Sequence, residues 1–392
     1  MKKLFTVSLL LLGLSLSAQQ KSPYIHKVYD FCPAPGQFAN ELPEYESGDN
    51  AREMALKAEE SIEAQEKILV SLGGYGGYII FGFDHEVINV PNEYDFKILG
   101  NAFYANANPN PDAPEKGGSS EPGIVMVSYD ANGNGRPDDE WYELAGSEYY
   151  KPETIHNYKI TYYKPDPDKP PTPDMSYPAL NDTTYIRWVD NQGNQGYISR
   201  NVYHDQPYWH QWIEADTLVF EGTKLADNYI DESGVGSYYV QYAYGWGYVD
   251  NHPNSDQLSN FNIEWAVDKN GNKVNLSCIH FIKIYTAVNQ YCGWLGETST
   301  EIMGAKDLHP NAAASIQHSQ QAKDITLLNN PIKEQLIIAS AQRHKATVYN
   351  TSGTPMMSFS IEAGTNYIPC QQLPSGLYVI VTDNKTIKFI KI

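Results

Sequence analysis

Tyr158-Lys159-Ile160-Thr161-Tyr162-Tyr163 alternates apolar and polar side chains, which is the period of a strand with one buried face. Similar short apolar stretches recur along the chain and are separated by turn residues such as Asp190-Asn191-Gln192-Gly193-Asn194. They predict strands at Tyr78–Phe83, Ile124–Tyr129, Tyr185–Val189, Gln195–Ser199, Leu218–Glu221, Tyr238–Tyr244, Ile263–Val267 and Ile279–Ala287. We therefore predict an all-β body, a two-sheet β-sandwich of jelly-roll type.

One N-terminal helix is expected at residues 50–66. Asp49 or Asn50 caps it, and Met54, Ala58 and Ile62 recur at helical spacing. The glycine-rich run Gly73–Gly77 follows. A phosphate loop needs a helix and a Lys-Ser/Thr pair after its glycines, whereas a strand follows here, so we interpret the run as a bend.

Residues 1–18 have the pattern of a signal peptide. Lys2-Lys3 precedes the apolar run Leu4–Leu16, and Leu16-Ser17-Ala18 offers a cleavage site. Position 19 is Gln, so the lipidated cysteine of a bacterial lipoprotein is not expected. Loss of the two lysines takes the formal charge from -19 to -21, which argues against nucleic acid as a partner.

The cysteines Cys32, Cys278, Cys292 and Cys370 permit disulfides in an exported protein, but the sequence leaves their pairing open.

The body is expected to span residues 21–304. Residues 305–323 are polar and aperiodic and are predicted to form a linker. Residues 324–392 are predicted to form a small Ig-like β-sandwich domain. Its strands are expected at Gln335–Ala339, Lys345–Tyr349, Met356–Ile361, Leu377–Thr382 and Lys385–Ile390.

This last segment resembles the type A C-terminal sorting domain of the type IX secretion system. The resemblance rests on Asn330-Pro331, Leu336-Ile337-Ile338, Val348-Tyr349-Asn350, Leu373-Pro374-Ser375-Gly376-Leu377-Tyr378-Val379 and Lys388-Phe389-Ile390-Lys391-Ile392. Gly376, Tyr378, Lys388 and Lys391 are the motif residues. The resemblance implies the type IX machinery as a partner and the outer cell surface, reached through the periplasm, as the destination.

A calcium loop is predicted at residues 130–140. Oxygen-bearing side chains recur at alternate positions from Asp130, and Gly135 permits the bend that turns them inward. Hard oxygen ligands select Ca²⁺, so a structural ion is expected, with an ordinary solvated turn as the alternative. The candidate ligands are Asp130, Asn132, Asn134, Asp138, Asp139 and the Arg136 carbonyl. Asp268-Lys269-Asn270-Gly271-Asn272 looks similar but lacks later acids and is predicted to be a hairpin turn.

Aromatic side chains gather near two polar, glycine-containing stretches. Aromatic faces stack on sugar rings or flat ligands, so a ligand face is predicted, with packing in the sandwich core as the equal alternative. The candidates are Trp209, Trp212, Tyr244, Trp246 and Tyr248. His204, His210 and His252 match no metal or general-base signature and are interpreted as solvated loop residues.

The body resembles a family of bacterial cell-surface proteins that accompany outer-membrane receptors, some of them linked to cobalamin uptake. The matching pieces are Gly73–Tyr78, Phe83–His85, Gly100–Phe103, Ser119–Gly123, Trp141–Ser147 and Gly296–Glu301. The resemblance implies a surface protein that binds a glycan or a small molecule such as a corrinoid, with an outer-membrane receptor as a partner. A secreted hydrolase of polysaccharide or peptide is the rival hypothesis, and an adhesion or structural protein is the third. Whether the chain is an enzyme stays open, with a binding role favoured.

Overall fold

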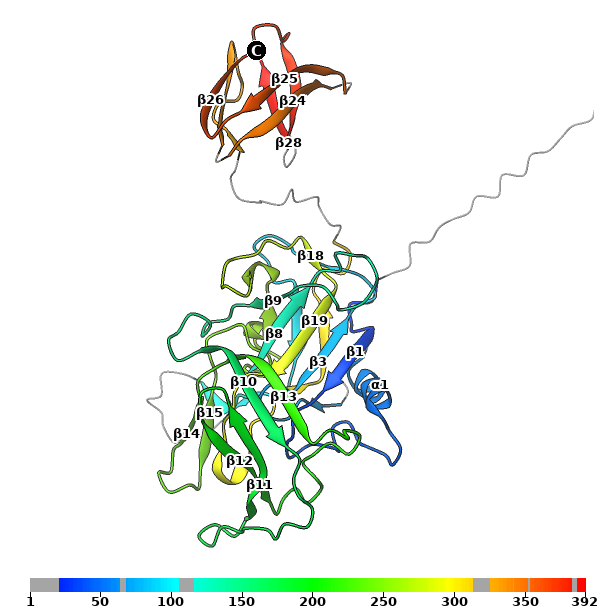
Figure 1. Ribbon diagram of the computed structural model, residues 1–392, viewed down its shortest axis with the longest axis vertical. Coiled ribbons are helices and arrows are strands. Elements are labelled where there is room, and N and C mark those ends of the chain that lie inside the picture. Colours follow the sequence, from blue (N-terminus) through cyan, green and yellow to red (C-terminus); the bar gives the residue numbers. More distant parts are fainter. Residues whose placement is uncertain are drawn as a thin grey trace, which may run out of the picture. The chain divides into compact units, whose positions relative to one another are not determined.

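A computed structural model describes residues 21–63, 68–105, 116–312, 325–340, 342–351, 353–382 and 386–392. The predicted signal peptide and most of the predicted linker lie outside these residues. The chain divides into a body and a C-terminal unit, each of which is a β-structure with its own core (Figure 1).

A six-stranded antiparallel sheet forms the centre of the body. Its order is β1 (Lys27–Cys32), β3 (Tyr78–Gly82), β19 (Phe281–Thr286), β8 (Gly123–Ser128), β9 (Trp141–Leu144) and β17 (Ala266–Val267). The inner strands β3, β19 and β8 are buried almost throughout, which explains their nearly continuous apolar sequences.

A four-stranded sheet packs against this one and runs in front of it in Figure 1. Its order is β12 (Gln195–Asn201), β11 (Leu180–Asp190), β10 (Ile155–Tyr163) and β13 (Thr217–Lys224). Tyr158, Ile160 and Tyr162 point inward from β10 and are almost completely buried, together with Tyr285 from the first sheet and Tyr75 from the bend before β3. The all-β, sandwich-like fold predicted from the alternation on β10 is confirmed.

Smaller sheets extend the body. One has the order β14 (Tyr229–Asp231), β15 (Tyr239–Tyr242), β7 (Gly117–Ser119) and β6 (Phe103–Tyr104), and another has the order β16 (Asn260–Phe261), β5 (Phe96–Leu99) and β21 (Gly304–Asp307). The pairs β18 (Cys278–Ile279) with β4 (Val87–Ile88) and β2 (Val70–Ser71) with β20 (Glu301–Ile302) complete it, with 3-10 turns at Gln257–Ser259, Ile263–Trp265 and Gly293–Leu295.

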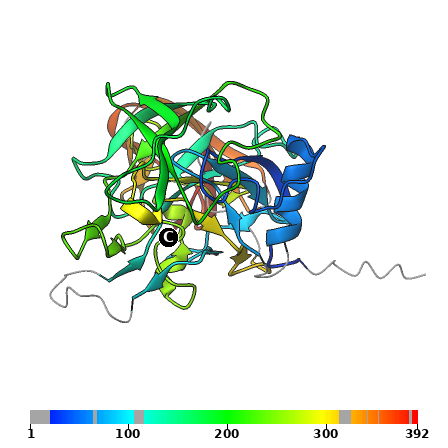
Figure 2. The same ribbon diagram turned by 90° about the horizontal axis from the view of Figure 1, so that it is seen from below.

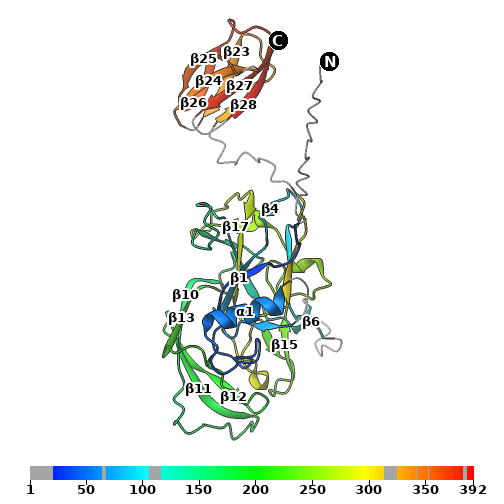
Figure 3. The ribbon, with the colours of Figure 1, turned by 90° about the vertical axis from the view of Figure 1, so that its right-hand side faces the viewer.

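The helix α1 (Ala51–Ile62) lies beside the edge strand β1 (Figure 3). Asn50 caps its first turn, and Glu53 reaches back to the Asn50 N–H in a capping box. Met54, Ala58 and Ile62 are buried, and Glu59 accepts a hydrogen bond from the Val28 N–H. Figure 2 shows the blue helix on one flank of the body and the green strands of the four-stranded sheet on another. Among the described helices, none has the length and apolar character needed to cross a membrane.

Two features differ from the sequence-based expectations, and the structure also shows the state of three cysteines whose pairing the sequence left open. Residues 263–265 form a 3-10 turn rather than a strand, because Asn262 caps them and only Ala266–Val267 pair with a neighbour. The body extends beyond the expected boundary at residue 304, since β21 pairs with β5 as far as Asp307. Cys32, Cys292 and Cys370 are free thiols.

The glycine-rich run makes the bend before β3. A side chain at Gly73 would collide with the Ala34 carbonyl, and one at Gly76 would collide with Phe220. Both glycines have positive φ, at 68° and 84°. The bend therefore requires glycine for steric and conformational reasons together.

The C-terminal unit has two sheets. Their orders are β22 (Ile325–Leu327), β23 (Gln335–Ser340) and β26 (Gly364–Pro369), then β25 (Pro355–Ile361), β24 (His344–Asn350), β27 (Gly376–Thr382) and β28 (Thr386–Lys391). Tyr378 stacks on Phe389 at 5.5 Å between ring centroids, and its hydroxyl donates to the Pro374 carbonyl at 2.9 Å. Of the motif residues, Tyr378 therefore contributes to the core of this unit, while Gly376 and Lys388 lie on its surface and Lys391 is partly buried.

Candidate functional site

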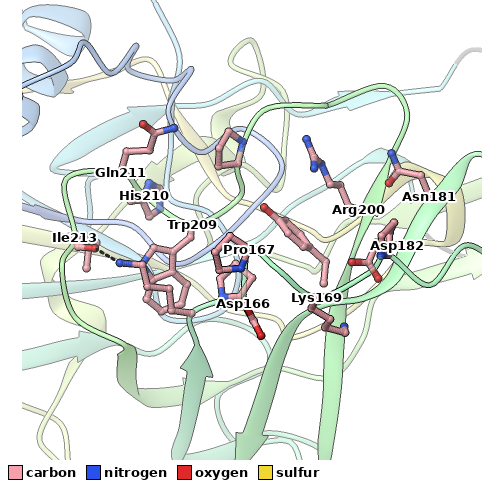
Figure 4. Close-up of a pocket in the computed structure, with 15 residues that line it drawn as sticks. Asp166, Pro167, Lys169, Asn181, Asp182, Arg200, Trp209, His210, Gln211 and Ile213 are labelled. Carbon is pink, nitrogen blue, oxygen red and sulfur yellow. Dashed lines mark hydrogen bonds between the residues drawn. The ribbon is translucent and has the colours of Figure 1, made fainter.

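A cavity of about 700 Å³ opens at one end of the four-stranded sheet (Figure 4). One wall is the proline-rich connection between β10 and β11, and another is the connection between β12 and β13. Its lining residues are Lys164, Pro165, Asp166, Pro167, Lys169, Pro171, Asn181, Asp182, Tyr185, Arg200, Pro207, Trp209, His210, Gln211 and Ile213. Its volume is typical of a small-molecule site.

Hydrogen bonds fix the two walls in place. Asp182 accepts from the Thr172 N–H at 3.1 Å and from the Thr184 N–H at 3.0 Å, which ties the proline-rich segment back to β11. At the other end of that segment, the Lys164 N–H donates to the Asp216 carbonyl at 2.9 Å. The segment that the sequence marks only as Pro/Asp-rich therefore has a defined position over the sheet end.

Buried polar atoms around this cavity lack partners among the described residues. They are Asn181 Oδ1, Arg200 Nε, Trp209 Nε1 and His210 Nδ1. A buried polar atom without a partner costs about 1–3 kcal/mol, so four in one place are unusual for a purely structural region. Trp209 and His210 are themselves only 4% and 2% exposed.

The protonation of His210 follows from its surroundings. Burial lowers the pKa of His210 to about 4, so the ring is neutral near pH 7. Its Nε2 lies 2.9 Å from the Ala34 carbonyl and must carry the proton, which leaves Nδ1 as an acceptor. The residues that line the cavity therefore carry N–H donors, on Trp209 and Arg200, and acceptors, on His210 and Asn181, all of them at buried atoms.

The predicted aromatic ligand face is not one surface. Trp209 lines the cavity, but Trp212 stacks between Phe31 and Tyr45. Tyr248 is buried in the sandwich core and Tyr244 packs beside it. Trp246 is 37% exposed and lies against Trp265, with ring centroids 4.6 Å apart. The ligand role of these five residues stays a prediction, and the cavity at Trp209 is the one site in which we place any of them.

Two of the three loop histidines are not solvated as interpreted. His210 is 2% exposed and His252 is 7% exposed, and both donate to or accept from nearby groups. The polar residues next to His210 and His252 in the sequence suggested exposure. The segments that bury these two histidines are distant in the sequence, so the burial could not be predicted.

A cluster of carboxyl groups lies elsewhere in the body. Glu121, Asp250 and Glu301 have oxygens within 4.8 Å of one another. Asp250 Oδ1 accepts from the N–H groups of Asn101 and Ala102 at 2.8 Å, and its Oδ2 accepts from the Glu301 N–H at 2.9 Å. Burial, and then the neighbouring acidic groups, raise the pKa of all three carboxyls, that of Glu121 to about 8.

Local sequence patterns do not identify this cluster as a site. Glu121 and Glu301 do fall in Ser119–Gly123 and Gly296–Glu301, two of the motifs that carry the resemblance of the body. These two motifs are the sequence feature that could have indicated the cluster. Their approach to Asp250 depends on long-range folding, which no local sequence pattern predicts.

The predicted calcium loop connects β8 with β9 and is exposed. Asp130 accepts from the N–H groups of Asn134 and Gly135, at 3.1 and 2.8 Å, and the amides of Asn132 and Asn134 donate to Asp138. These hydrogen bonds lower the pKa of Asp138. Asp139 accepts from the Ala131 N–H at 3.1 Å, and Gly133 and Gly135 supply the positive φ values that close the loop.

Comparisons with known proteins identify the C-terminal unit. Residues 329–392 match the family model described as the secretion system C-terminal sorting domain. These residues are a type IX secretion sorting domain, and the protein is exported to the cell surface or secreted. No curated protein sequence matches the chain.

Among solved structures, the chain is similar to PorZ, a surface component of the type IX secretion system of Porphyromonas gingivalis. The identity is 15% and the TM-score is 0.15, over 23% of this chain. The match spans only 14% of the PorZ chain.

The raised carboxyl pKa values predict a pH-dependent stability of the body. Between pH 4.5, the unperturbed pKa of Glu, and about 8, Glu121 stays protonated in the folded chain but ionises in the unfolded chain. The folded state then binds more protons, so the free energy of unfolding falls as pH rises, by about 1.4 kcal/mol per pH unit for each such group. Urea unfolding at pH 5 and pH 8 measures this, followed by tryptophan fluorescence because the sequence places every tryptophan in the body.

Glu301→Gln should flatten this pH dependence, because the amide cannot ionise. The control is Glu221→Gln, which changes an exposed carboxyl on β13 and should leave the slope unaltered. A wild-type stability that rises from pH 5 to pH 8 would contradict the buried, protonated cluster.

Export should depend on the folded core of the sorting domain. Phe389→Ala removes a fully buried ring at a cost of about 3–5 kcal/mol, a large part of the stability of so small a unit. We expect this variant to accumulate in the periplasm, as should a chain lacking Lys388–Ile392. Ile390→Ala, at the neighbouring position that is 47% exposed, should still reach the surface. Fractionation and surface proteolysis distinguish the two locations, and equal export of both variants would show that this core is not needed.

Proposed function

We propose that the protein is a surface-attached binding protein that takes a glycan, or another small polyhydroxylated ligand, in the cavity at Trp209. The observation that carries this proposal is the group of unpartnered donors and acceptors around a cavity with aromatic and proline walls. Sugar hydroxyls both donate and accept, and the C–H faces of sugar rings pack on aromatic rings. Export to the cell surface places such a site where extracellular ligands are found.

The charges at the cavity favour a ligand with an anionic group. Arg200 lies over the Tyr185 ring at 5.4 Å, and no salt bridge holds it within the described part of the chain. Lys164 and Lys169 add positive charge, while Asp182 is engaged by backbone N–H groups. Acidic sugars would pair with Arg200, which presents a rigid set of donors. A corrinoid and an outer-membrane receptor stay proposed partners that rest on the resemblance of the body alone.

The rival activity is hydrolysis of a polysaccharide or peptide. Asp166 and Asp182 are the carboxylates of the cavity, and two such groups are the usual machinery of glycoside hydrolysis. Asp182 already accepts bonds that hold the cavity wall, which favours binding over catalysis. Product analysis after incubation with any bound glycan separates the two, since a hydrolase shortens it.

Trp209→Phe should weaken glycan binding, because it replaces the indole by a smaller phenyl ring and removes the Nε1–H donor. The loss of one hydrogen bond predicts a Kd higher by about two- to tenfold. A glycan array with the full chain selects the ligand, and calorimetry measures the change. Trp246→Phe is the matched control, since Trp246 lies against Trp265 outside the cavity. If the control loses binding and Trp209→Phe does not, the ligand site is at Trp246 and the proposed cavity is wrong.

We also propose that the loop at residues 130–140 holds a structural Ca²⁺. Its support is the spacing of Asp130, Asn132, Asn134 and Asp138 in a closed loop, where the Asn132 and Asn134 amides donate to Asp138 and the Asn134 N–H donates to Asp130. The Arg136 carbonyl and Asp139 are further candidate ligands. The ion would offset repulsion between the carboxylates of Asp130, Asp138 and Asp139. Its role would be to order the β8–β9 connection, with no part in chemistry.

Chelation should therefore lower the melting temperature of the body by a few degrees. A ligand at a hundredfold excess over its Kd stabilises the folded state by about 2.7 kcal/mol. Asp130→Ala should abolish the difference between calcium and chelator. Asp268→Ala is the matched control, because Asp268 accepts from the Asn270 and Asn272 N–H groups in a similar turn. Identical melting curves with and without calcium, and no metal by elemental analysis, would show the loop to be a solvated turn.

A further inference from the structure

A second cavity, of about 80 Å³, lies between the four-stranded sheet and the segments at residues 74–75 and 288–298, and it shares no lining residue with the first. Its walls are mainly aromatic, from Tyr75, Tyr162, Trp188, Tyr197 and Tyr291. The Tyr197 side chain is 45% exposed, so this wall reaches the surface. One water takes about 30 Å³ of liquid volume, so the cavity holds two or three waters or one compact chemical group, but no sugar ring.

Glu297 is the one charged side chain among the described residues that line this cavity. It is 6% exposed, its Oε1 accepts from the Gln37 N–H at 2.8 Å, and its Oε2 has no partner in the described chain. The Tyr75 hydroxyl in the same wall is also without one. A buried carboxylate oxygen left open in an aromatic cavity is costly unless something pairs with it.

Among the remaining polar groups of the lining, the Tyr291 hydroxyl also has no partner in the described chain, whereas the amides of Gln290 and Asn289 are engaged. Gln290 donates to Asn228 Oδ1 at 2.7 Å and to Thr298 Oγ1 at 3.0 Å, and Asn289 donates to the Tyr158 hydroxyl at 3.2 Å. A hard metal ion would need about six oxygen ligands, which this lining does not supply. Aromatic faces around a single carboxylate suit an organic cation, since the rings attract positive charge and the carboxylate balances it.

We propose that this cavity binds the alkylammonium group of a small ligand, with Glu297 as the counter-ion and the aromatic rings as a cage. The ammonium group would fill the cavity, and the rest of the ligand would extend past Tyr197 to the surface. This site is separate from the glycan cavity and does not depend on it.

Protonation of Glu297 opposes such binding. Burial raises the pKa of Glu297 to about 7, and a cation favours the ionised form, so affinity should rise as pH increases through 7. Burial also raises the pKa of the other titratable groups that face Glu297, which stay neutral at pH 7. They are Tyr162, Tyr208, Tyr291, Cys292 and Glu121.

The test compares choline with its uncharged carbon isostere, in which a tert-butyl group replaces the trimethylammonium group. Calorimetry with the full-length wild-type protein at pH 8 should give saturable choline binding, with the isostere weaker by about tenfold or more. Glu297→Gln should weaken choline binding by a similar factor. Glu143→Gln is the matched control, because burial also raises the pKa of Glu143 to about 7 but its carboxylate contacts Thr223 instead.

Equal binding of choline and its isostere would overturn the proposal, as would an absence of saturable choline binding by the wild type. If Glu297→Gln does not fold, the wild-type comparison still decides, and Tyr197→Ala supplies a second variant at an exposed position. Loss of choline binding in Glu143→Gln as well as in Glu297→Gln would show a general effect on the fold, and would also overturn it.

Discussion

The burial of Asp250 is the constraint on which much of the body depends. Its carboxylate accepts N–H bonds from the segment after β5 and from β20, and its carbonyl accepts one from Glu121 before β8. These segments are far apart in the sequence, and Asp250 itself has a positive φ of 53°. A buried carboxyl group is costly unless hydrogen bonds satisfy its oxygens, so the three segments must keep their relative positions. A side chain at Gly100 would collide with Asp250, so the fit extends to the backbone around it.

The four-stranded sheet is held in place by other contacts. It is anchored through Tyr158, Ile160 and Tyr162, whose buried side chains face the central sheet. Beyond its strand ends, the two long connections need only satisfy their own hydrogen bonds, which Asp182 and Lys164 do. A rigid sheet with long connections at one end is a common arrangement for a binding site, because the scaffold fixes the loops without determining their sequences.

The sequence was most informative where structure is local. The alternation of Tyr158–Tyr163 gave the strand and its buried face, and the cap at Asn50 gave the start of α1. It failed at residues 263–265, where a side-chain cap from Asn262 outweighs β-propensity over three positions. It also grouped Trp209 with Trp246, because both lie in aromatic, polar stretches, although the fold places only Trp209 at the cavity.

Sites assembled from distant segments could not be predicted in this way. Glu297 reaches Gln37 across 260 residues, and its unpartnered oxygen is a property of the folded core rather than of its neighbours in the sequence.

The two cavities follow one electrostatic rule. The chain carries a formal charge of -19, which should repel anions at long range. Charges are screened beyond about 8 Å at physiological salt, so selectivity inside a cavity depends on the side chains that line it. Arg200 makes one cavity suited to anionic groups, and Glu297 makes the other suited to cations, on a surface that the net charge alone would describe as uniformly acidic.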